Sequence, residues 1–280
     1  MNINNFFNID ERLMQLDEKI LAEISPRFKE TDDITEYNQL KMLSAFIKNG
    51  VTESAFAGST GYGYDDRGRE ILERVMADAM GAEDSLIRHN FVSGTHTLTV
   101  ALFGLLRPGD KVLVLTGRPY DTITGVFGID EKTDGSLADF GVEYHEIALL
   151  PDGTPDKAAI KKELAANAYK MAYIQRSRGY STRPSLTIEK IRELCDIVRE
   201  VSPQSIIMVD NCYGEFTEKQ EPCEVGADII AGSLIKNPGG GIAPTGGYIA
   251  GRHELIEKCA YRLTCPGVGR EAGATLGHSR

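Results

Sequence analysis

Apolar positions along most of the chain fall into short runs that are separated by segments with helical spacing. Runs typical of buried strands lie at 85–92, 111–117, 142–149, 168–175, 205–210, 227–233 and 246–251. Helical patterns lie between or after them, at 95–106, about 156–166, 188–201 and from about 253. Short apolar strands that alternate with helices predict an α/β protein with a mostly parallel sheet covered by helices on both faces.

The first part of the chain has helical spacing without strands. One pattern covers 11–24, and a second covers roughly 37–48 and stops at Gly50. The apolar positions of the first pattern are Leu13, Leu16, Ile20 and Ile24. These patterns predict two amphipathic helices that pack outside a core. A loop rich in glycine and tyrosine follows at 58–70, and the next helical pattern ends at Gly81, a typical C-cap residue.

Composition narrows the class of protein. The chain has 280 residues, of which 41% are hydrophobic and 26% are charged, as in ordinary globular proteins. The formal net charge of -10 argues against nucleic acid or an anionic membrane as the main partner. The five cysteines lack CxxC spacing, so we expect no metal site. We find no signal-peptide pattern and no apolar stretch long enough to cross a membrane, and we therefore expect a cytoplasmic protein.

In such a sheet, ligands bind where loops leave the carboxyl ends of the strands. The segment SGTHT at 93–97 follows a strand and begins a helix. Ser93, Gly94 and Thr95 would place small side chains and N–H groups at a helix N-terminus, which suits a phosphate. The alternative is an ordinary Ser/Thr N-cap with a turn glycine.

Two further loops carry candidate chemistry. In MVDNCYGEF, Asp210 ends an apolar strand and could pair with a protonated ring nitrogen, while Tyr213 could hydrogen-bond a ring hydroxyl. In AGSLIKNPGGG, Lys236 precedes a glycine run and could form an imine with a carbonyl group, and Ser233 could touch the same phosphate. The alternatives are a carboxylate that caps a turn and a solvated loop lysine.

The three motifs follow one another in the order phosphate loop, aspartate and lysine. In this order the sequence resembles a known family. It is similar to fold-type I pyridoxal-phosphate (PLP) enzymes of the aspartate-aminotransferase fold, nearest the cystathionine/methionine lyase branch. More narrowly, it resembles the bacterial aluminium resistance proteins, which are methionine gamma-lyase-like. The segments that carry the resemblance are GYGYDDRGRE, VSGTHTLTVALFGLLRPGD, RSRGYSTRPSLT, MVDNCYGEF and AGSLIKNPGGGIAPTGGYIAGR, which span most of residues 58–252.

The resemblance implies roles for the cofactor-binding residues. Lys236 would form the Schiff base with PLP and move the proton at the substrate Cα, and Asp210 would keep the pyridine nitrogen protonated. Gly94 and Thr95 would bind the phosphate, helped by Ser233. Tyr120 would stack on the ring and is a candidate acid for the leaving group.

Other residues have implied or alternative roles. Tyr64 and Arg67 would reach the phosphate of a neighbouring subunit, although their spacing departs from the Tyr-x-Arg of the lyase branch, and a solvated Arg67 is the alternative. Arg176 and Arg178 are candidates for a substrate carboxylate or for a surface role. His96 is expected to pack against its helix. The resemblance also implies a homodimer or homotetramer.

The length departs from the family pattern. Only 44 residues (280 minus 236) follow Lys236, too few for the smaller C-terminal domain of this fold. We therefore expect a truncated chain with a helical segment at 1–57, a PLP-binding large domain at 58–265 and the start of a missing small domain at 266–280. The uncovered apolar surface would favour aggregation.

The leading functional hypothesis is a PLP-dependent carbon–sulfur lyase that acts on a sulfur-containing amino acid of the methionine or cystathionine type. An aminotransferase or an aldol-type PLP enzyme would share the same residues near the ring. An inactive PLP-binding fragment is the third possibility. A nucleotide-binding Rossmann protein is disfavoured, because the first strand–loop–helix unit lacks GxGxxG.

Overall fold

The structure is a computed structural model that describes residues 6–59, 63–131 and 133–273. Within these residues seven strands form one sheet in the order β1-β7-β6-β5-β4-β2-β3. The strands are β1 (Asp84–Arg88), β2 (Lys111–Val114), β3 (Glu143–Glu146), β4 (Met171–Gln175), β5 (Ile206–Asp210), β6 (Ile229–Ser233) and β7 (Gly247–Gly251). β7 runs antiparallel to both of its neighbours, β1 and β6, and the other pairs are parallel. The predicted mostly parallel sheet is confirmed.

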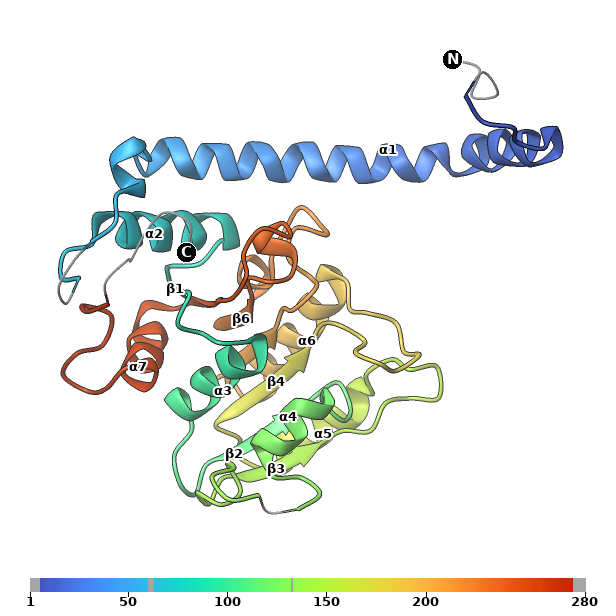
Figure 1. Cartoon of the computed structure of the whole chain (residues 1–280). Coiled ribbons are helices and arrows are strands. Elements are labelled where there is room, and N and C mark those ends of the chain that lie inside the picture. Colours follow the sequence, from blue (N-terminus) through green and yellow to red (C-terminus); the bar gives the residue numbers. More distant parts are fainter. Residues whose placement is uncertain (1–5, 60–62, 132, 274–280) are drawn as a thin grey trace.

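Helices cover both faces of this sheet (Figure 1). The α-helices are α1 (Glu11–Lys48), α2 (Arg67–Met80), α3 (Gly94–Leu105), α4 (Asp121–Phe127), α5 (Lys157–Ala166), α6 (Ile188–Val201) and α7 (His253–Leu263), and short 3-10 helices are η2 (Glu53–Phe56), η3 (Pro222–Val225) and η4 (Asn237–Gly239). One core cluster joins the sheet to α3, α4 and α7, and a second joins it to α2, α5 and α6. Because both faces are covered, β4, β5, β6 and β7 are buried along their whole length.

The N-terminal region differs from its prediction. A single helix, α1, replaces the two predicted helices, and Asp10 caps its N-terminus by accepting from the backbone N–H of Arg12 at 2.8 Å. The first part of α1 projects beyond the body (Figure 1). Its apolar side chains Leu13, Leu16, Ile20 and Ile24 are exposed. The prediction that the first helix packs outside a core is therefore wrong for the described residues, because helical spacing reveals an apolar face but not what covers it.

The second part of α1 does pack on the body. Ala45 forms a small core cluster with Ile71 and Val75 of α2. The buried side-chain amide of Asn38 donates to the carbonyl oxygens of Phe216 and Glu218 at 3.0 and 3.1 Å. The helix thus contacts both α2 and the loop that follows β5.

Three arginines hold the last described segment against the body. Arg69 donates to the carbonyl oxygen of Gly273 at 2.7 Å, and Arg88 donates to that of Arg270 at 3.2 Å. The guanidinium of Arg270 in turn binds the Asp84 carboxylate at 2.9 and 3.1 Å. The predicted domain division stays a prediction, and its end at 274–280 lies outside the described residues.

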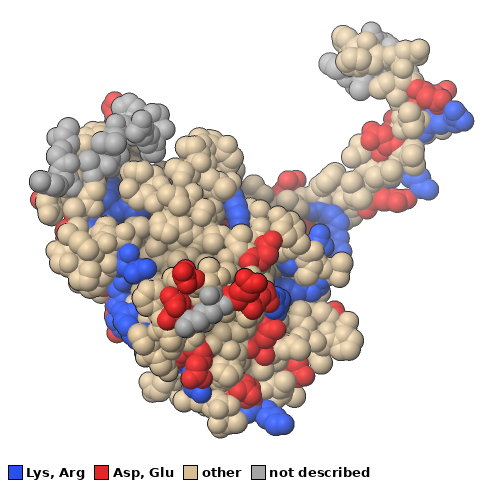
Figure 2. All heavy atoms as spheres, turned by 60° about the horizontal axis from the view of Figure 1, so that its bottom comes forward, with Lys and Arg blue, Asp and Glu red and all other residues tan. Residues whose placement is uncertain are grey.

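The surface reflects the excess of acidic residues. Figure 2 shows acidic side chains gathered near the middle of one face of the body, with α1 projecting from it. Among the described helices, none combines the length and the apolar character that a bilayer crossing requires.

Candidate active site

A cavity of about 490 Å³ lies where the loops leave the carboxyl ends of the central strands. It is lined by residues from α3, from the start of α4 and the residue before it, from the ends of β5 and β6, and from the loops after β4, β5 and β6. The predicted site residues that line it are Gly94, Thr95, Tyr120, Asp210, Tyr213, Ser233 and Lys236. Residues far apart in sequence therefore meet at the edge of the sheet where a ligand was predicted.

The N-terminus of α3 forms one wall of the cavity. The Ser93 hydroxyl caps this helix by accepting from the backbone N–H of His96 at 3.1 Å, so its side chain positions the helix and does not line the cavity. The N–H groups of Gly94 and Thr95 lie in the first turn, where a helix offers no internal acceptor and carries positive partial charge. A Cβ on Gly94 would lie 3.0 Å from the Ser233 Cβ, so only glycine leaves this space open.

Ser233 faces the same space. Its side chain is fully buried at the end of β6, and among the described residues its hydroxyl has no hydrogen-bond partner. A buried hydroxyl without a partner is costly and points to a missing ligand group. Together with the N–H groups of α3, it forms a set of donors that suits a phosphate.

Asp210 supplies a buried carboxylate at the end of β5. It is 4% exposed, and it accepts from the backbone N–H of Cys212 at 3.1 Å and from the Tyr173 hydroxyl at 3.5 Å. Burial raises the pKa of this carboxyl, because the hydrogen bonds and the nearby charge of Lys236, which lower the pKa, do not give full compensation for the lost hydration. A cationic ring N–H would supply that compensation.

Lys236 lines the cavity and precedes η4. Its amine is 4.2 Å from the ring centre of Tyr213, a residue held at φ 67°. A bulky side chain rarely adopts this left-handed conformation, and strained backbone is typical of functional sites. Burial lowers the pKa of Lys236, but Cys212 and Asp210 nearby raise it by more, so that the pKa lies above its ordinary value.

Tyr120 enters the cavity from the residue that precedes α4. Its backbone N–H donates to the Gln175 side chain at 2.6 Å, and its hydroxyl donates to the Tyr180 hydroxyl at 3.3 Å. This hydrogen bond is the largest cause, and burial the second, of a rise in the pKa of Tyr120 to about 12. Tyr180 was not predicted as a site residue. It lies in the loop after β4, which ends at Gln175, and the rule that ligands bind at the carboxyl ends of strands would have identified this loop.

The two candidate arginines have different surroundings. Arg178 is exposed and lines the cavity, so it stays a candidate for a substrate carboxylate. Arg176 is 2% exposed, and its guanidinium donates to the side chains of Asn211 and Glu218, both at 2.9 Å. The interpretation of Arg176 as a substrate-binding residue is therefore wrong, because its donors hold together the loop after β5.

Three further candidates lie away from the cavity. Tyr64 and Arg67 are exposed and do not line it, and their predicted contact with a neighbouring subunit stays a prediction. His96 packs edge-on against Phe91, with ring centres 5.9 Å apart, as expected for a residue that supports its helix.

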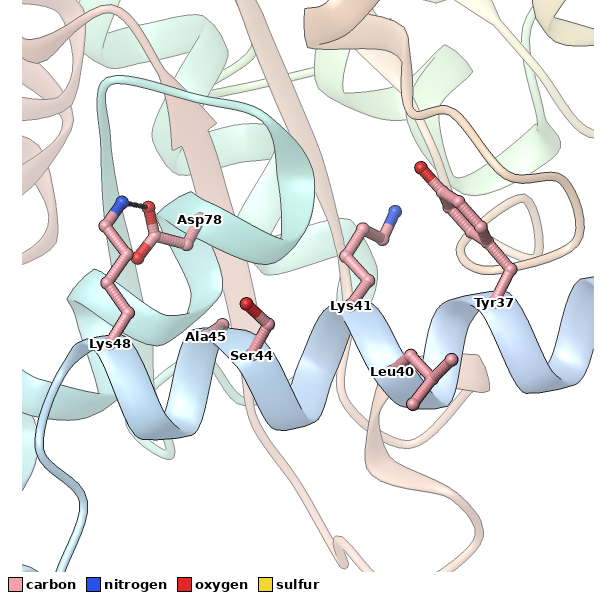
Figure 3. A pocket seen from close by; sticks show the side chains of 7 residues that line it. All are labelled: Tyr37, Leu40, Lys41, Ser44, Ala45, Lys48 and Asp78. Atoms are coloured by element: carbon pink, nitrogen blue, oxygen red, sulfur yellow. Dashed lines mark hydrogen bonds and ion pairs between the residues drawn. The ribbon is translucent and has the colours of Figure 1, made fainter.

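A second cavity of about 420 Å³ lies between α1 and α2 (Figure 3). Two lysines line this cavity. The amine of Lys48 is paired with the Asp78 carboxylate at 2.5 Å, and the amine of Lys41 donates to the carbonyl oxygen of Lys219 at 3.3 Å. None of the residues predicted to bind a cofactor or to act in catalysis lines this cavity. The cavity at the edge of the sheet is therefore the candidate active site.

The strand order and the helices on both faces define an α/β protein of the aminotransferase-like fold. Residues 13–280 match the family model described as methionine gamma-lyase, and the chain belongs to this family. The match covers more than half of the chain, so the family predicted from the motifs is confirmed.

Individual relatives agree with this assignment. Protein YnbB of Bacillus subtilis is 48% identical over 92% of this chain, which spans 61% of the relative's length. A Listeria innocua structure, described as a proposed cystathionine beta-lyase involved in aluminium resistance, is 54% identical with a TM-score of 0.93, covering 96% of this chain and 66% of that one. The PLP-dependent protein YhfS of Escherichia coli shares the fold, with a TM-score of 0.66 at 17% identity over 88% of this chain and 62% of that one. The chain thus spans about three fifths of the curated relative's length.

Proposed function

We propose that this protein is a PLP-dependent carbon–sulfur lyase that acts on a sulfur-containing amino acid of the methionine or cystathionine type. One observation carries the proposal. A buried carboxylate (Asp210), a buried hydroxyl (Ser233) that has no hydrogen-bond partner in the described part of the chain, and a lysine amine (Lys236) line one cavity beside a helix N-terminus. The family match and the name of the Listeria innocua relative support the reaction class.

The residues of the cavity fit PLP. The first-turn N–H groups of Gly94 and Thr95, with the Ser233 hydroxyl, would bind the phosphate. Asp210 would pair with the pyridine N–H, and this pairing would compensate for the burial that raises the pKa of its carboxyl. Lys236 would bind the aldehyde covalently. When bound, PLP supplies an electron sink for the carbanion at the substrate Cα.

Two side chains would move protons at the substrate. The Lys236 amine would take the proton from Cα, since it lines the same cavity as Asp210 and Ser233. Tyr120 would give its hydroxyl proton to the sulfur that leaves, and its pKa of about 12 keeps this hydroxyl protonated at neutral pH. Arg178 at the mouth would orient a substrate carboxylate.

We also propose that the protein is a cytoplasmic homodimer or homotetramer. The exposed apolar side chains of α1 and the exposed Tyr64 and Arg67 support contact between subunits. All five cysteines are free, which is typical of a reducing compartment. Sedimentation of the purified protein tests the oligomer, and a monomer at micromolar concentration would exclude it.

The first test measures the absorbance of the purified chain with PLP before and after borohydride. We expect a visible band that borohydride removes, together with PLP fixed to the peptide that contains Lys236. Lys236→Ala should abolish both, whereas the exposed Lys258→Ala on α7 should keep them. The absence of fixed PLP in folded protein would contradict the cofactor proposal for this chain.

The second test measures the reaction. Thiol release from cystathionine and methionine is expected, with this chain and with a version extended to the length of its relatives. Conversion of PLP to pyridoxamine phosphate by an amino donor, without thiol release from either version, would instead indicate an aminotransferase.

A further inference from the structure

We propose that Tyr180 positions Tyr120 and returns protons to it, so that the two hydroxyls form a relay between the cavity and water. This inference rests on the proposed function, because it assigns a proton path to the acid of that reaction. Tyr180 is not among the candidate residues predicted from the sequence.

The contact between the two tyrosines has the geometry of a relay. Their hydroxyl oxygens are 3.3 Å apart, and their ring centres are 5.4 Å apart with 40° between the ring planes. Both side chains line the cavity. Tyr180 is 86% exposed, whereas Tyr120 is half-buried, so that the Tyr180 hydroxyl joins Tyr120 to solvent.

The side chain of Gln175 couples the two loops that carry the tyrosines. Its oxygen accepts from the backbone N–H of Tyr120 at 2.6 Å, and its nitrogen donates to the carbonyl oxygen of Ser177 at 3.0 Å. Arg183 holds the second loop from the other side, because it donates to the carbonyl oxygens of Gln175 and Ser177 at 3.0 and 2.5 Å. An exposed tyrosine is thus carried by an anchored loop.

Gly179 lets this loop approach the Tyr120 ring. Its φ is +59°, and a Cβ there would lie 3.4 Å from Cδ2 of Tyr120 and 3.5 Å from the Gln175 amide nitrogen. The loop backbone therefore packs directly against the ring that Tyr180 faces. Three features, namely the Gln175 bridge, the Arg183 anchor and Gly179, hold the tyrosines together.

The proton transfer balances without another reactant. Tyr120 gives its proton to the departing thiolate, which forms an S–H bond as the Tyr120 O–H bond breaks. Tyr180 then gives its proton to the Tyr120 oxygen, and a solvent water gives a proton to the Tyr180 oxygen. The hydroxide that is left takes up the Cα proton that Lys236 holds, so that both groups return to their starting state. The hydrogen bond raises the pKa of Tyr120 to about 12, so the Tyr120 O–H bond is intact in the resting state at neutral pH.

The direct test replaces only the Tyr180 hydroxyl, in Tyr180→Phe, and follows Tyr120 by NMR of tyrosine labelled at the ring carbon that bears oxygen. The signal is assigned with Tyr120→Phe. We expect the pKa of Tyr120 to fall from about 12 toward the ordinary value of 10.0. Tyr261→Phe, which removes an exposed hydroxyl on α7, serves as the matched control. An unchanged Tyr120 titration in Tyr180→Phe overturns the inference.

The same variants are then compared in thiol release as a function of pH. In Tyr180→Phe we expect kcat to fall several-fold with little change in KM, and the alkaline limb of kcat to move to lower pH by the shift measured for Tyr120. An unmoved limb in an active enzyme would overturn the relay. Retention of PLP in both variants separates this result from failure of the proposed function, which would appear as loss of PLP or of thiol release in the unsubstituted protein.

Discussion

The two sides of the cavity are held in different ways. The closed side consists of Gly94, Asp210 and Ser233, which belong to α3 and to the ends of β5 and β6. Asp210 is 4% exposed and Ser233 is fully buried. The open side consists of Tyr120, Arg178 and Tyr180, which lie in loops near solvent. The side suited to the cofactor is therefore part of the core, whereas the side that would meet the substrate is built on loops.

Because of this difference, substitutions on the two sides should affect different properties of the protein. Groups on the closed side cannot move without disturbing the sheet, so changes there should alter cofactor binding. Groups on the open side can change without loss of the core, so changes there should alter substrate recognition and proton transfer.

Asp210→Asn should reduce activity more than any other substitution considered for the two sides. A smaller loss would contradict the assignment of the closed side to the cofactor. Asparagine keeps the size but loses the charge that would pair with a ring N–H, so we expect thiol release to fall by about 100-fold or more. The cofactor-free chain should unfold at the same or a higher temperature at neutral pH, because burial raises the pKa of Asp210 and its ionised form destabilises the fold.

Steady-state kinetics and thermal unfolding measure these two outcomes. The exposed Asp196→Asn on α6 is the control and should change neither. A clear loss of apoprotein stability in Asp210→Asn would mean that the carboxylate has a structural role instead.

Gly94→Ala should have an intermediate effect on the closed side. The added Cβ would lie 3.0 Å from the Ser233 Cβ and would narrow the space assigned to the phosphate. We expect PLP to bind about 10-fold more weakly, equivalent to about 1.4 kcal/mol. Fluorescence titration of the apoprotein with PLP measures this loss, and Gly125→Ala, which has open space around it, is the control. Equal affinity for both variants would remove the α3 N-terminus from the cofactor site.

Arg178→Ala should have the smallest effect, confined to the open side. The exposed guanidinium is screened by water, so we expect KM to rise by roughly 3- to 10-fold with PLP affinity unchanged. The exposed Arg192→Ala on α6 should leave both quantities unchanged. A loss of PLP affinity in Arg178→Ala would show that the two sides are not independent.

The sequence predicted the closed side better than the open side, for a physical reason. Apolar runs located the strands, and residues at strand ends have positions that follow from the sheet, so Asp210 and Ser233 were placed correctly at the cavity. Loops have no such period. Arg176 and Arg178 are two residues apart, yet one is buried and one is exposed, and only the path of the loop separates them.

Two elements of the fold also escaped prediction. The α4 helix is short, and the seven residues of Asp121–Phe127 give too little periodicity to be recognised. The continuity of α1 through Pro26 was missed, because the polar stretch between the two apolar patterns looked like a break. Of the two, α4 contributes Thr122 and Ile123 to the lining of the cavity, whereas α1 contributes none of its lining residues.

The pairing of β1 with β7 imposes an order on biosynthesis. Ser85 pairs with Ala250, so the first strand to leave the ribosome must wait for 165 further residues (250 minus 85) before its partner exists. During that interval β2, β3, β4 and β5 can already assemble in parallel, while β1 keeps an unsatisfied edge that other chains could extend. Lys236 lies between β6 and β7, the last two described strands in chain order, so its amine is synthesised after β5 and β6, which carry Asp210 and Ser233.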